Sequence, residues 1–583
     1  MKYLFLSCIF LVSSCTIFQR VDKAQVDPIP YKLETNRSAT YSEVSSYYRS
    51  LGKASRYLQV NEVGLTDVGE PLLEVIIDRD RKFSPKDSEV AGKAVLFINN
   101  GIHPGEPCGI DASMILARDI LDDRILFKYL ENVVLVIVPV YNIGGAKNRG
   151  AFNRANQNGP AQHGFRGNAK NLDLNRDFIK CDSKNAETFT KLFTKWNPDV
   201  FVDTHTSNGA DYQHIITLIA TQKDKIAPSL GSYMEFQFVP KIYDGMAEQG
   251  YDMSPYVYSK GTTPQEKGIL AFPDLPRYSS GFAALHHTLS FMPETHMFKT
   301  FEERVESTLY LLKEMLRLTS LESETIQKKR LEAMLYYKRL QQAPINWTLD
   351  EDIAITTQFK GYESSYKPSD ISGLPRLFYD RDKPTNLEID YYNAYEVSQS
   401  ISVPFAYIIP QAYSEIVDRL KWNGVEVTQL EEDKEILVEM YYIEDYETSQ
   451  SPYESHYLHY NTEVYKTTRN QTFYKGDYMV RMNQVTNRFI LETLEPQAPD
   501  SYFSWNFFDG ILAQKEYFSA YVFEDLAAEL LNRDPQLREV LEMKKAEDEA
   551  FAKDGRAQLR FIYESSPYYE ETHKLYPVAR IMN

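Results

Sequence analysis

The run VVLVIVPV at residues 133–140 is the feature that most constrains the fold of this chain. An apolar run without polar alternation is typical of a strand buried on both faces, as in a mainly parallel sheet covered by helices. Shorter strands are expected at 72–78, 94–100, 199–204 and 288–293.

Helical spacing occurs between these strands, at 109–128 and 184–196, and again over 300–341. Alternation of strands and helices predicts an α/β domain with a mainly parallel, mixed central sheet flanked by helices. After about residue 345 short β-rich runs with many tyrosines dominate, and 519–553 has helical spacing. A second, β-rich domain with C-terminal helices is therefore expected.

The charge of the chain excludes one class of partner. Its 583 residues include 82 acidic and 64 basic side chains, a formal net charge of −18. Proteins that bind nucleic acid carry a basic surface, and this composition gives no sign of one. We therefore expect no nucleic-acid partner.

The first residues have the pattern of an export signal. Lys2 precedes an almost wholly apolar stretch, Tyr3 to Val12, which is too short to cross a bilayer as a helix. Val12-Ser13-Ser14-Cys15 resembles the lipobox of bacterial lipoproteins, in which the cysteine is lipidated and becomes the mature N-terminus. An ordinary cleaved signal peptide is the alternative.

These observations predict the organisation of the chain. We expect a signal peptide at 1–14, a tether at 15–45, an α/β domain at 46–342 and a β-rich accessory domain at 343–583. Lipid on Cys15 would anchor the protein in the membrane of the cell envelope, on the periplasmic or the cell-surface side. An oxidising compartment permits a disulfide between Cys108 and Cys181, but sequence alone leaves that pairing open.

A possible metal centre follows the expected strand at 94–100. His103 and Glu106, three residues apart in HPGE, can face one metal ion from a turn. His205 ends another expected strand and would emerge at the same edge of the sheet, where open α/β sheets bind ligands. Two histidines and one glutamate, with a fourth position left to water, form a known catalytic zinc arrangement.

A second sequence pattern strengthens this interpretation. Residues 164–178 read GFRGNAKNLDLNRDF. In order and spacing, HPGE, this segment and the later histidine resemble the zinc carboxypeptidase family, the carboxypeptidase A-like metallopeptidases. The resemblance covers roughly residues 60–340, and it implies one zinc ion per chain, held by His103, Glu106 and His205.

The resemblance also implies roles for the residues of that segment. Asp173 would orient the ring of a ligand histidine, and Asn175 and Arg176 would bind the terminal carboxylate of the substrate. A planar guanidinium suits that bidentate contact. Arg166 would polarise the scissile carbonyl and stabilise the oxyanion.

Two further residues follow from position in the family pattern. Glu294, in TLSFMPETHMF, matches the general base that takes a proton from the zinc-bound water. Thr295 and His296 follow it, where many members have an apolar residue and an arginine. Tyr278 is the nearest candidate for the mobile tyrosine of the family, although it lies closer to Glu294 in sequence than is usual.

The function expected is that of a zinc metallocarboxypeptidase that removes the last residue of peptides with a free carboxylate. One alternative is an amide hydrolase that acts on murein stem peptides or N-acyl amino acids. Another is a lipoprotein that kept the fold and only binds its ligand. The first two predict chelator-sensitive turnover, and the third predicts none.

Overall fold

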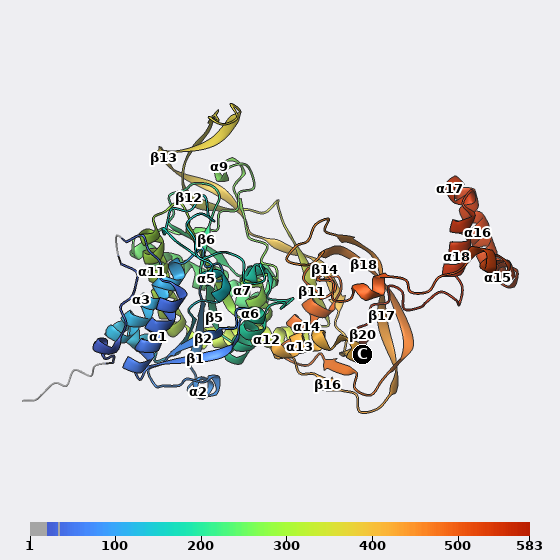
Figure 1. Cartoon of the computed structure of the whole chain (residues 1–583), viewed down its shortest axis with the longest axis horizontal. Coiled ribbons are helices and arrows are strands. Elements are labelled where there is room, and N and C mark those ends of the chain that lie inside the picture. The colour runs from blue at the N-terminus through green and yellow to red at the C-terminus, as the bar shows by residue number, and fades with distance from the viewer. Residues whose placement is uncertain (1–19, 33–34, 583) are drawn as a thin grey trace, which may run out of the picture.

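The computed structural model describes residues 20–32 and 35–582, which form two domains side by side (Figure 1). The expected signal peptide and Cys15 lie outside these residues. Among the helices of the described residues, none is both long and apolar enough to cross a membrane.

The first domain is built on a nine-stranded sheet in the order β1-β2-β4-β3-β5-β10-β7-β8, with β6 also paired to β10. Its centre is parallel, from β4 through β3 and β5 to β10, and antiparallel strands flank it. The predicted mixed, mainly parallel sheet is confirmed. The strands are β1 (Leu58–Leu65), β2 (Pro71–Ile77), β3 (Ala94–Asn99), β4 (Val133–Val138), β5 (Val200–Asp203), β6 (His205–Ser207), β7 (Ile216–Ala220), β8 (Ser254–Pro255) and β10 (Leu289–His296).

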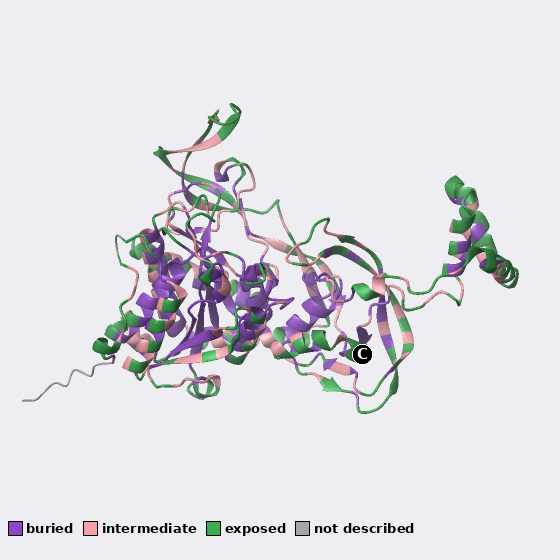
Figure 2. Cartoon of the chain, in the orientation of Figure 1, coloured by how far each residue is buried: buried purple, intermediate pink, exposed green. Residues whose placement is uncertain are grey.

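Helices cover both faces of this sheet, which explains why its central strands are apolar without alternation. In β3, Leu96 and Ile98 face one apolar core, and Val95 and Phe97 face the other. Figure 2 shows the buried sheet between partly exposed helices. The helices are α1 (Tyr41–Ala54), α2 (Pro85–Val90), α3 (Cys108–Asp122), α4 (Arg124–Tyr129), α5 (Ile143–Lys147), α6 (Lys184–Trp196), α7 (Pro228–Tyr233), α8 (Val239–Glu248), α9 (Pro264–Lys267), α10 (Ser279–Leu285), α11 (Phe301–Leu321) and α12 (Ser323–Arg339).

Part of the expected tether packs on the first domain. Val21 and Ala39 are buried in its core, and the guanidinium of Arg20 donates to the carbonyl of Leu121 at 3.3 Å. The backbone N–H of Ala39 donates to the carboxylate of Asp111 at 3.2 Å. The described residues before α1 therefore lie against the first domain and do not form a free linker.

The second domain contains three further sheets. β11 pairs with β14, the long hairpin β12–β13 pairs with β9 of the first domain, and six strands form the order β16-β19-β15-β20-β17-β18. The prediction that the C-terminal part of the chain is rich in β-structure is confirmed. Its strands, with β9, are β9 (Ile269–Leu270), β11 (Gln342–Leu349), β12 (Ile355–Pro368), β13 (Pro375–Tyr392), β14 (Tyr395–Ser402), β15 (Ala406–Ile409), β16 (Thr428–Gln429), β17 (Lys434–Thr448), β18 (His459–Phe473), β19 (Tyr478–Arg481) and β20 (Ala579–Ile581).

Helices of the second domain fall into two groups. α13 (Ser414–Trp422) and α14 (Asn487–Leu494) pack beside the first domain. A separate helical group has a small core of its own and projects from the far end of the molecule (Figure 1). It consists of α15 (Ala520–Arg533), α16 (Pro535–Glu547), α17 (Glu549–Ala552) and α18 (Gly555–Glu564).

The two domains share one hydrophobic core. Phe193 of α6 and Phe282 of α10 belong to the same apolar cluster as Tyr407 of β15 and Phe489 of α14. Burial of apolar side chains is the main favourable term in folding. Residues 405–505 therefore complete the covering of one face of the first sheet.

Cys108 and Cys181, whose pairing the sequence left open, are separate buried free thiols. The thiol of Cys108 lies 3.4 Å from the hydroxyl of Thr295, and that of Cys181 lies 3.5 Å from the hydroxyl of Thr190. Both cysteines therefore have structural surroundings that involve no disulfide.

Two buried histidines lie where the domains meet. The ring of His286 is 3.2 Å from the side-chain oxygen of Asn423, and that of His287 is 3.2 Å from the carbonyl of Val485. Burial lowers the pKa of His286 to about 4 and that of His287 to about 3. Both rings are therefore neutral in the folded chain at neutral pH.

This arrangement predicts acid-sensitive stability. Unfolded histidine has a pKa of about 6.5, so the unfolded chain binds protons first as the pH falls. The stability that comes from keeping these rings neutral is complete above about pH 6.5, and it is lost as the pH falls from there toward 4. Between pH 7 and pH 5 each histidine should lower the free energy of unfolding by about 2 kcal/mol.

Urea titrations at pH 7 and pH 5 measure this effect. In His286→Gln the difference in the free energy of unfolding between the two pH values should be smaller by about 2 kcal/mol. His573→Gln, remote from this contact, is the control, and an unchanged pH dependence in His286→Gln would contradict the assignment.

Candidate active site

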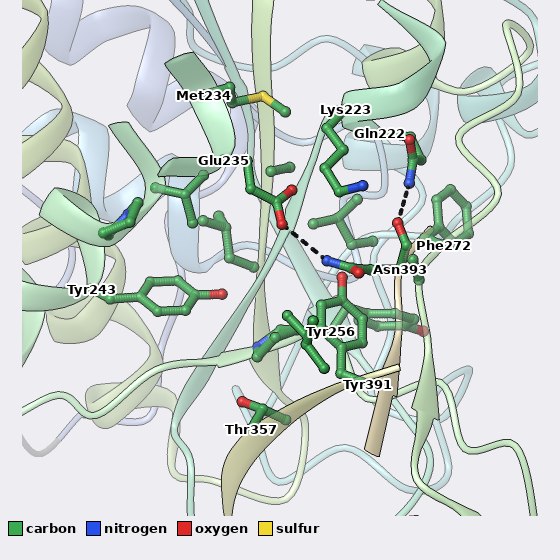
Figure 3. Close-up of a pocket in the computed structure, with 18 of the residues that line it drawn as sticks. Gln222, Lys223, Met234, Glu235, Tyr243, Tyr256, Phe272, Thr357, Tyr391 and Asn393 are labelled. Atoms are coloured by element: carbon green, nitrogen blue, oxygen red, sulfur yellow. Dashed lines mark hydrogen bonds between the residues drawn. The ribbon is translucent and has the colours of Figure 1, made fainter. Parts of the chain in front are cut away.

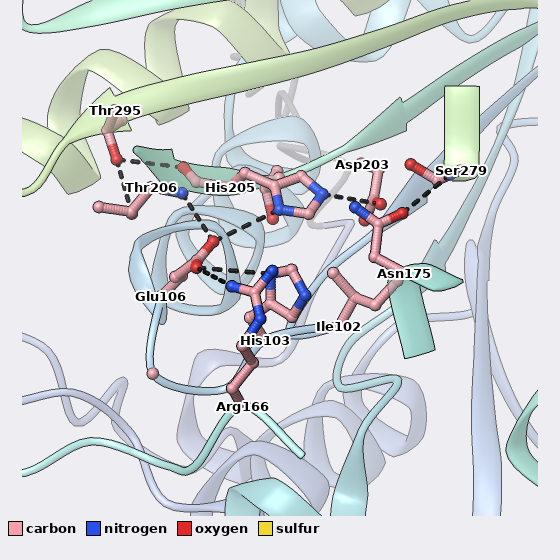
Figure 4. A network of polar contacts seen from close by, with 12 residues as sticks. Ile102, His103, Glu106, Arg166, Asn175, Asp203, His205, Thr206, Ser279 and Thr295 are labelled. Carbon is pink, nitrogen blue, oxygen red and sulfur yellow. Dashed lines mark hydrogen bonds and ion pairs between the residues drawn. The ribbon is translucent and has the colours of Figure 1, made fainter. Parts of the chain in front are cut away.

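The candidate site lies at the carboxyl ends of the central strands. The turn after β3 carries His103 and Glu106, β6 begins at His205, and β10 places Glu294 directly beside His205 in the strand register. A cavity of about 200 Å³ connects these side chains. Figure 4 shows His103, Glu106 and His205 turned toward one another.

Three side chains present their ligand atoms to one point. The Nδ1 atom of His103 lies 3.4 Å from one carboxylate oxygen of Glu106, and Nδ1 of His205 lies 3.4 Å from the other. One ligand atom from each residue falls within 4.8 Å of the other two. The expected ligand set is therefore brought together, although His205 is 102 positions from His103.

Two buried carboxylates orient the histidine rings. Nε2 of His103 is 2.8 Å from Asp173, and Nε2 of His205 is 2.9 Å from Asp203. Carboxylates in these positions fix the ring tautomer so that the opposite nitrogen can bind a metal, and they raise its basicity. Asp173 therefore lies where the sequence analysis expected it.

The chemistry of the donor set fits zinc. Nδ1 of His103 is buried and has no hydrogen-bond partner among the described residues. Although burial opposes ionisation, the nearby His103 and Arg154 hold the pKa of Glu106 well below its usual range. The ligand atoms are thus two imidazole nitrogens and an ionised carboxylate, a set that leaves a fourth zinc position open.

Asn175 and Arg176 lie in the 3₁₀ turn Leu174–Arg176, and both line the cavity. The side-chain oxygen of Asn175 accepts from the backbone N–H of Ser279 at 2.9 Å, so its amide nitrogen faces the cavity (Figure 4). The Arg176 guanidinium lies over the ring of Tyr278, 4.4 Å from its centroid. The structure therefore brings the three expected substrate-binding residues together.

Arginines also approach the metal ligands. Arg166 donates to Asp173 at 2.9 Å and lies 3.5 Å from Glu106. Arg154, which the sequence analysis did not single out, donates to Glu106 at 3.0 Å. Both line the cavity, so two guanidinium groups are within reach of a carbonyl oxygen bound there.

Glu294 faces the same cavity from β10. One of its carboxylate oxygens is buried without a hydrogen-bond partner among the described residues. Burial raises the pKa of Glu294 above its usual range, and the negative charge of Glu106 adds to this rise. A carboxylate with a raised pKa suits proton transfer near neutral pH.

A larger cavity of about 390 Å³ adjoins the site and shares Ile219, Tyr256 and Phe272 with it. Figure 3 shows the tyrosines and apolar side chains that surround it, together with the hydrogen bond between Glu235 and Asn393. Asn393 belongs to the second domain, so both domains contribute to this cavity.

Sequence reasoning missed two residues of the site. Asp203, the last residue of β5, stands two positions before His205, the first residue of β6, and a carboxylate so close to a proposed ligand was a usable signal. Arg154 lies in a long loop, where its sequence neighbours gave no signal of its contact with Glu106.

Comparisons with known proteins agree with this geometry. The zinc carboxypeptidase family model matches residues 44–289. The chain is 21% identical over 480 residues to Carboxypeptidase 2 of Trichophyton rubrum, covering 79% of this chain and 82% of the fungal protein. It is 23% identical over 430 residues to Carboxypeptidase 2 of Trichophyton tonsurans, covering 71% of this chain and 74% of that protein.

Solved structures with similarity to the chain include a metallo-carboxypeptidase from Burkholderia cenocepacia and carboxypeptidase A from Helicoverpa armigera. The former has a TM-score of 0.37 at 15% identity, covering 49% of this chain and 70% of that one. The latter has a TM-score of 0.38 at 14% identity, covering 52% and 78%.

A paired-histidine and glutamate centre at the carboxyl edge of this sheet defines a zinc-dependent hydrolase. Residues 44–289 match the zinc carboxypeptidase family model, and the chain is a metallocarboxypeptidase with a site for one zinc ion.

The ligand geometry predicts the metal content. Purified protein should contain about one zinc per chain, and His205→Ala should lose most of it because one of three ligands is gone. Asp203→Asn should weaken zinc binding by about 10- to 100-fold, as is typical when a carboxylate behind a ligand is changed. Elemental analysis and chelator competition measure both effects. His573→Ala, in the second domain, is the control, and normal zinc content in His205→Ala would show that the third ligand is another residue.

Proposed function

We propose that this metallocarboxypeptidase hydrolyses the last peptide bond of peptides that end in a free carboxylate. The observation that carries the proposal is the position of Arg176. Its guanidinium opens onto the same small cavity as the three metal ligands and Glu294. A substrate whose carboxylate binds there has its last peptide carbonyl near the metal ligands.

The carboxylate of the substrate would bind between Asn175 and Arg176. The amide nitrogen of Asn175 is held toward the cavity by the bond between its oxygen and Ser279. Hydrogen bonds from a guanidinium to a carboxylate are charge-assisted, so a bond from Arg176 would be stronger than one from a neutral donor. The ring of Tyr278 covers one face of the Arg176 guanidinium and limits the directions in which a ligand can approach it.

The chemistry would divide among a few residues. His103, Glu106 and His205 would hold the zinc, which, when bound, acidifies water and polarises a carbonyl group. Glu294 would accept a proton from the attacking water on its unpartnered carboxylate oxygen and pass it to the leaving amine. Arg166 would donate to the oxygen of the scissile carbonyl as negative charge develops there.

The walls of the cavity favour an apolar last residue. Ile219, Met292, Phe272 and Tyr256 line it, and the only carboxylates among its lining residues are Glu106 and Glu294. Apolar and aromatic side chains are therefore the expected class. A basic side chain would find no free carboxylate there, because Glu106 is a metal ligand and Glu294 is the candidate base, and an unpaired buried charge is costly.

The first experiment pairs peptides of one sequence with free or amidated C-termini. Incubated with the zinc enzyme, the free acids should lose single residues from the C-terminus, visible by mass spectrometry, and the amidated peptides should stay intact. Peptides that end in apolar residues should shorten first. Equal cleavage of acids and amides would remove the exopeptidase assignment.

The matched control is Glu294→Gln, which keeps the shape of the side chain but cannot accept the proton. We expect kcat to fall about 10²- to 10⁴-fold with zinc content unchanged. If the wild type leaves every peptide intact, cell-wall fragments and N-acyl amino acids are tested next, and turnover of these would favour an amide hydrolase. No turnover of any substrate would favour a protein that only binds its ligand.

We further propose that the chain is exported and lipid-anchored at a bacterial cell envelope. Support comes from the N-terminal sequence: Lys2, the apolar stretch to Val12, and Cys15 in a lipobox-like position. Anchoring would place the enzyme beside extracytoplasmic peptides.

The anchor is tested by fractionation of cells that express the full chain. Wild type should sediment with membranes, and Cys15→Ser should move to the soluble fraction because it has no thiol to carry lipid. Cys8→Ser, which changes the other cysteine of the N-terminal region, should stay with the membranes. Wild type in the soluble fraction would contradict the proposal.

A further inference from the structure

A turn of the second domain reaches the active site. Tyr453 and His456 pair as an isolated antiparallel bridge, with backbone bonds of 2.7 and 3.1 Å in the two directions. Glu454 and Ser455 between them have φ angles of 51° and 71°. We call residues 453–456 the docking turn.

The backbone of the docking turn is unfavourable by itself. Tight turns with two left-handed residues normally use asparagine or glycine, because other side chains are strained there. Here the two positions hold glutamate and serine. Strained conformations persist where surrounding contacts enforce them, and they gather at functional sites.

The contacts that hold the docking turn in this conformation are made with the segment that carries the carboxylate-binding residues. The hydroxyl of Tyr453 accepts a hydrogen bond from Nε of Arg176 at 3.0 Å. The carboxylate of Glu454 accepts from the backbone N–H of Asp173 at 2.8 Å. His456 lies 2.8 Å from the carboxylate of Asp182. Three of the four turn residues thus hold the segment 173–182.

These bonds fix the orientation of one guanidinium. Nε of Arg176 is held by Tyr453, Nη1 donates to the carbonyl of Asn175 at 2.8 Å, and Tyr278 covers a face. Among the described residues Nη2 has no hydrogen-bond partner. The bond to Tyr453 therefore leaves Nη2 as the donor that is open to a ligand.

The core of the second domain supports the docking turn. The ring of Tyr453 stacks on the fully buried Trp505, with 19° between the planes. Arg277 lies over both rings and forms a 2.8 Å ion pair with Asp500. Sites held by such packed support keep their geometry better than sites on free loops.

We propose that Tyr453 and Glu454 are positioning residues for substrate binding, so that the second domain completes the carboxylate-binding site of the first. This inference rests on the proposed function of Arg176. Neither residue lines the cavity; Tyr453 acts through the guanidinium of Arg176, and Glu454 acts through the backbone of the turn that carries it.

The test compares KM and kcat on a blocked dipeptide with a free carboxylate. Tyr453→Phe removes the hydroxyl and keeps the ring on Trp505. It should raise KM about 10-fold, as expected for loss of one hydrogen bond to a charged group, with kcat within about twofold and zinc content unchanged. Tyr457→Phe changes an exposed tyrosine of the same loop and should leave both constants unchanged.

A double-mutant cycle separates positioning from general destabilisation. In an Arg176→Ala background, Tyr453→Phe should have no further effect on KM, because the group that it positions is absent. Additive effects would overturn the inference. If Tyr453→Phe does not fold, Glu454→Ala and Glu454→Gln replace it: alanine should raise KM, and glutamine, which can still accept the bond from Asp173, should restore it.

The single variant Arg176→Ala, compared with Tyr453→Phe, separates failure of the exopeptidase function from failure of the positioning role. If it abolishes the preference for free acids over amides and Tyr453→Phe leaves KM unchanged, the positioning role fails and the exopeptidase function stands. If Arg176→Ala leaves that preference intact, the proposed function fails, and the inference fails with it.

Discussion

The carboxylate of Asp173 is the group on which the active site depends. It bonds Nε2 of His103 and Nε of Arg166, and it caps the turn that carries Asn175. The positive charge around it outweighs the cost of burial and holds its pKa far below the usual range. One ionised side chain thereby links a metal ligand, a candidate oxyanion donor and the carboxylate-binding turn.

The sheet supplies the other half of this arrangement. Because β3, β5 and β10 run parallel, their carboxyl ends meet at one edge, and residues far apart in sequence converge there. The two apolar cores hold the strands in register, and His205 lies directly opposite Glu294. The positions of the active-site residues therefore depend on the packing of apolar side chains that are not themselves catalytic.

Most of the correct predictions came from local sequence patterns, that is, from apolar runs and short motifs. The apolar runs gave the strands because burial on both faces leaves an unmistakable composition, and HPGE and the 164–178 segment gave the ligands and Arg176. Asp203 was predictable in principle from its place beside His205. The contacts of Tyr453 and Glu454 were not, since they join positions 277 and 281 residues apart, and no periodicity or spacing reports such a pairing. The unpaired cysteines likewise depended on distances that only the fold sets.

Because the two domains share one apolar core, the first domain cannot complete its core before the second domain is present. The whole first domain precedes Tyr407 and Phe489 in the chain, so when the chain folds from its N-terminus the face formed by α6 and α10 stays uncovered until those residues follow. A nascent chain at that stage has its metal ligands but neither its complete core nor the second-domain contact to Arg176. Maturation of this enzyme is thus tied to completion of the polypeptide, and a chain cut short between the domains would carry an apolar face that chaperones and proteases recognise.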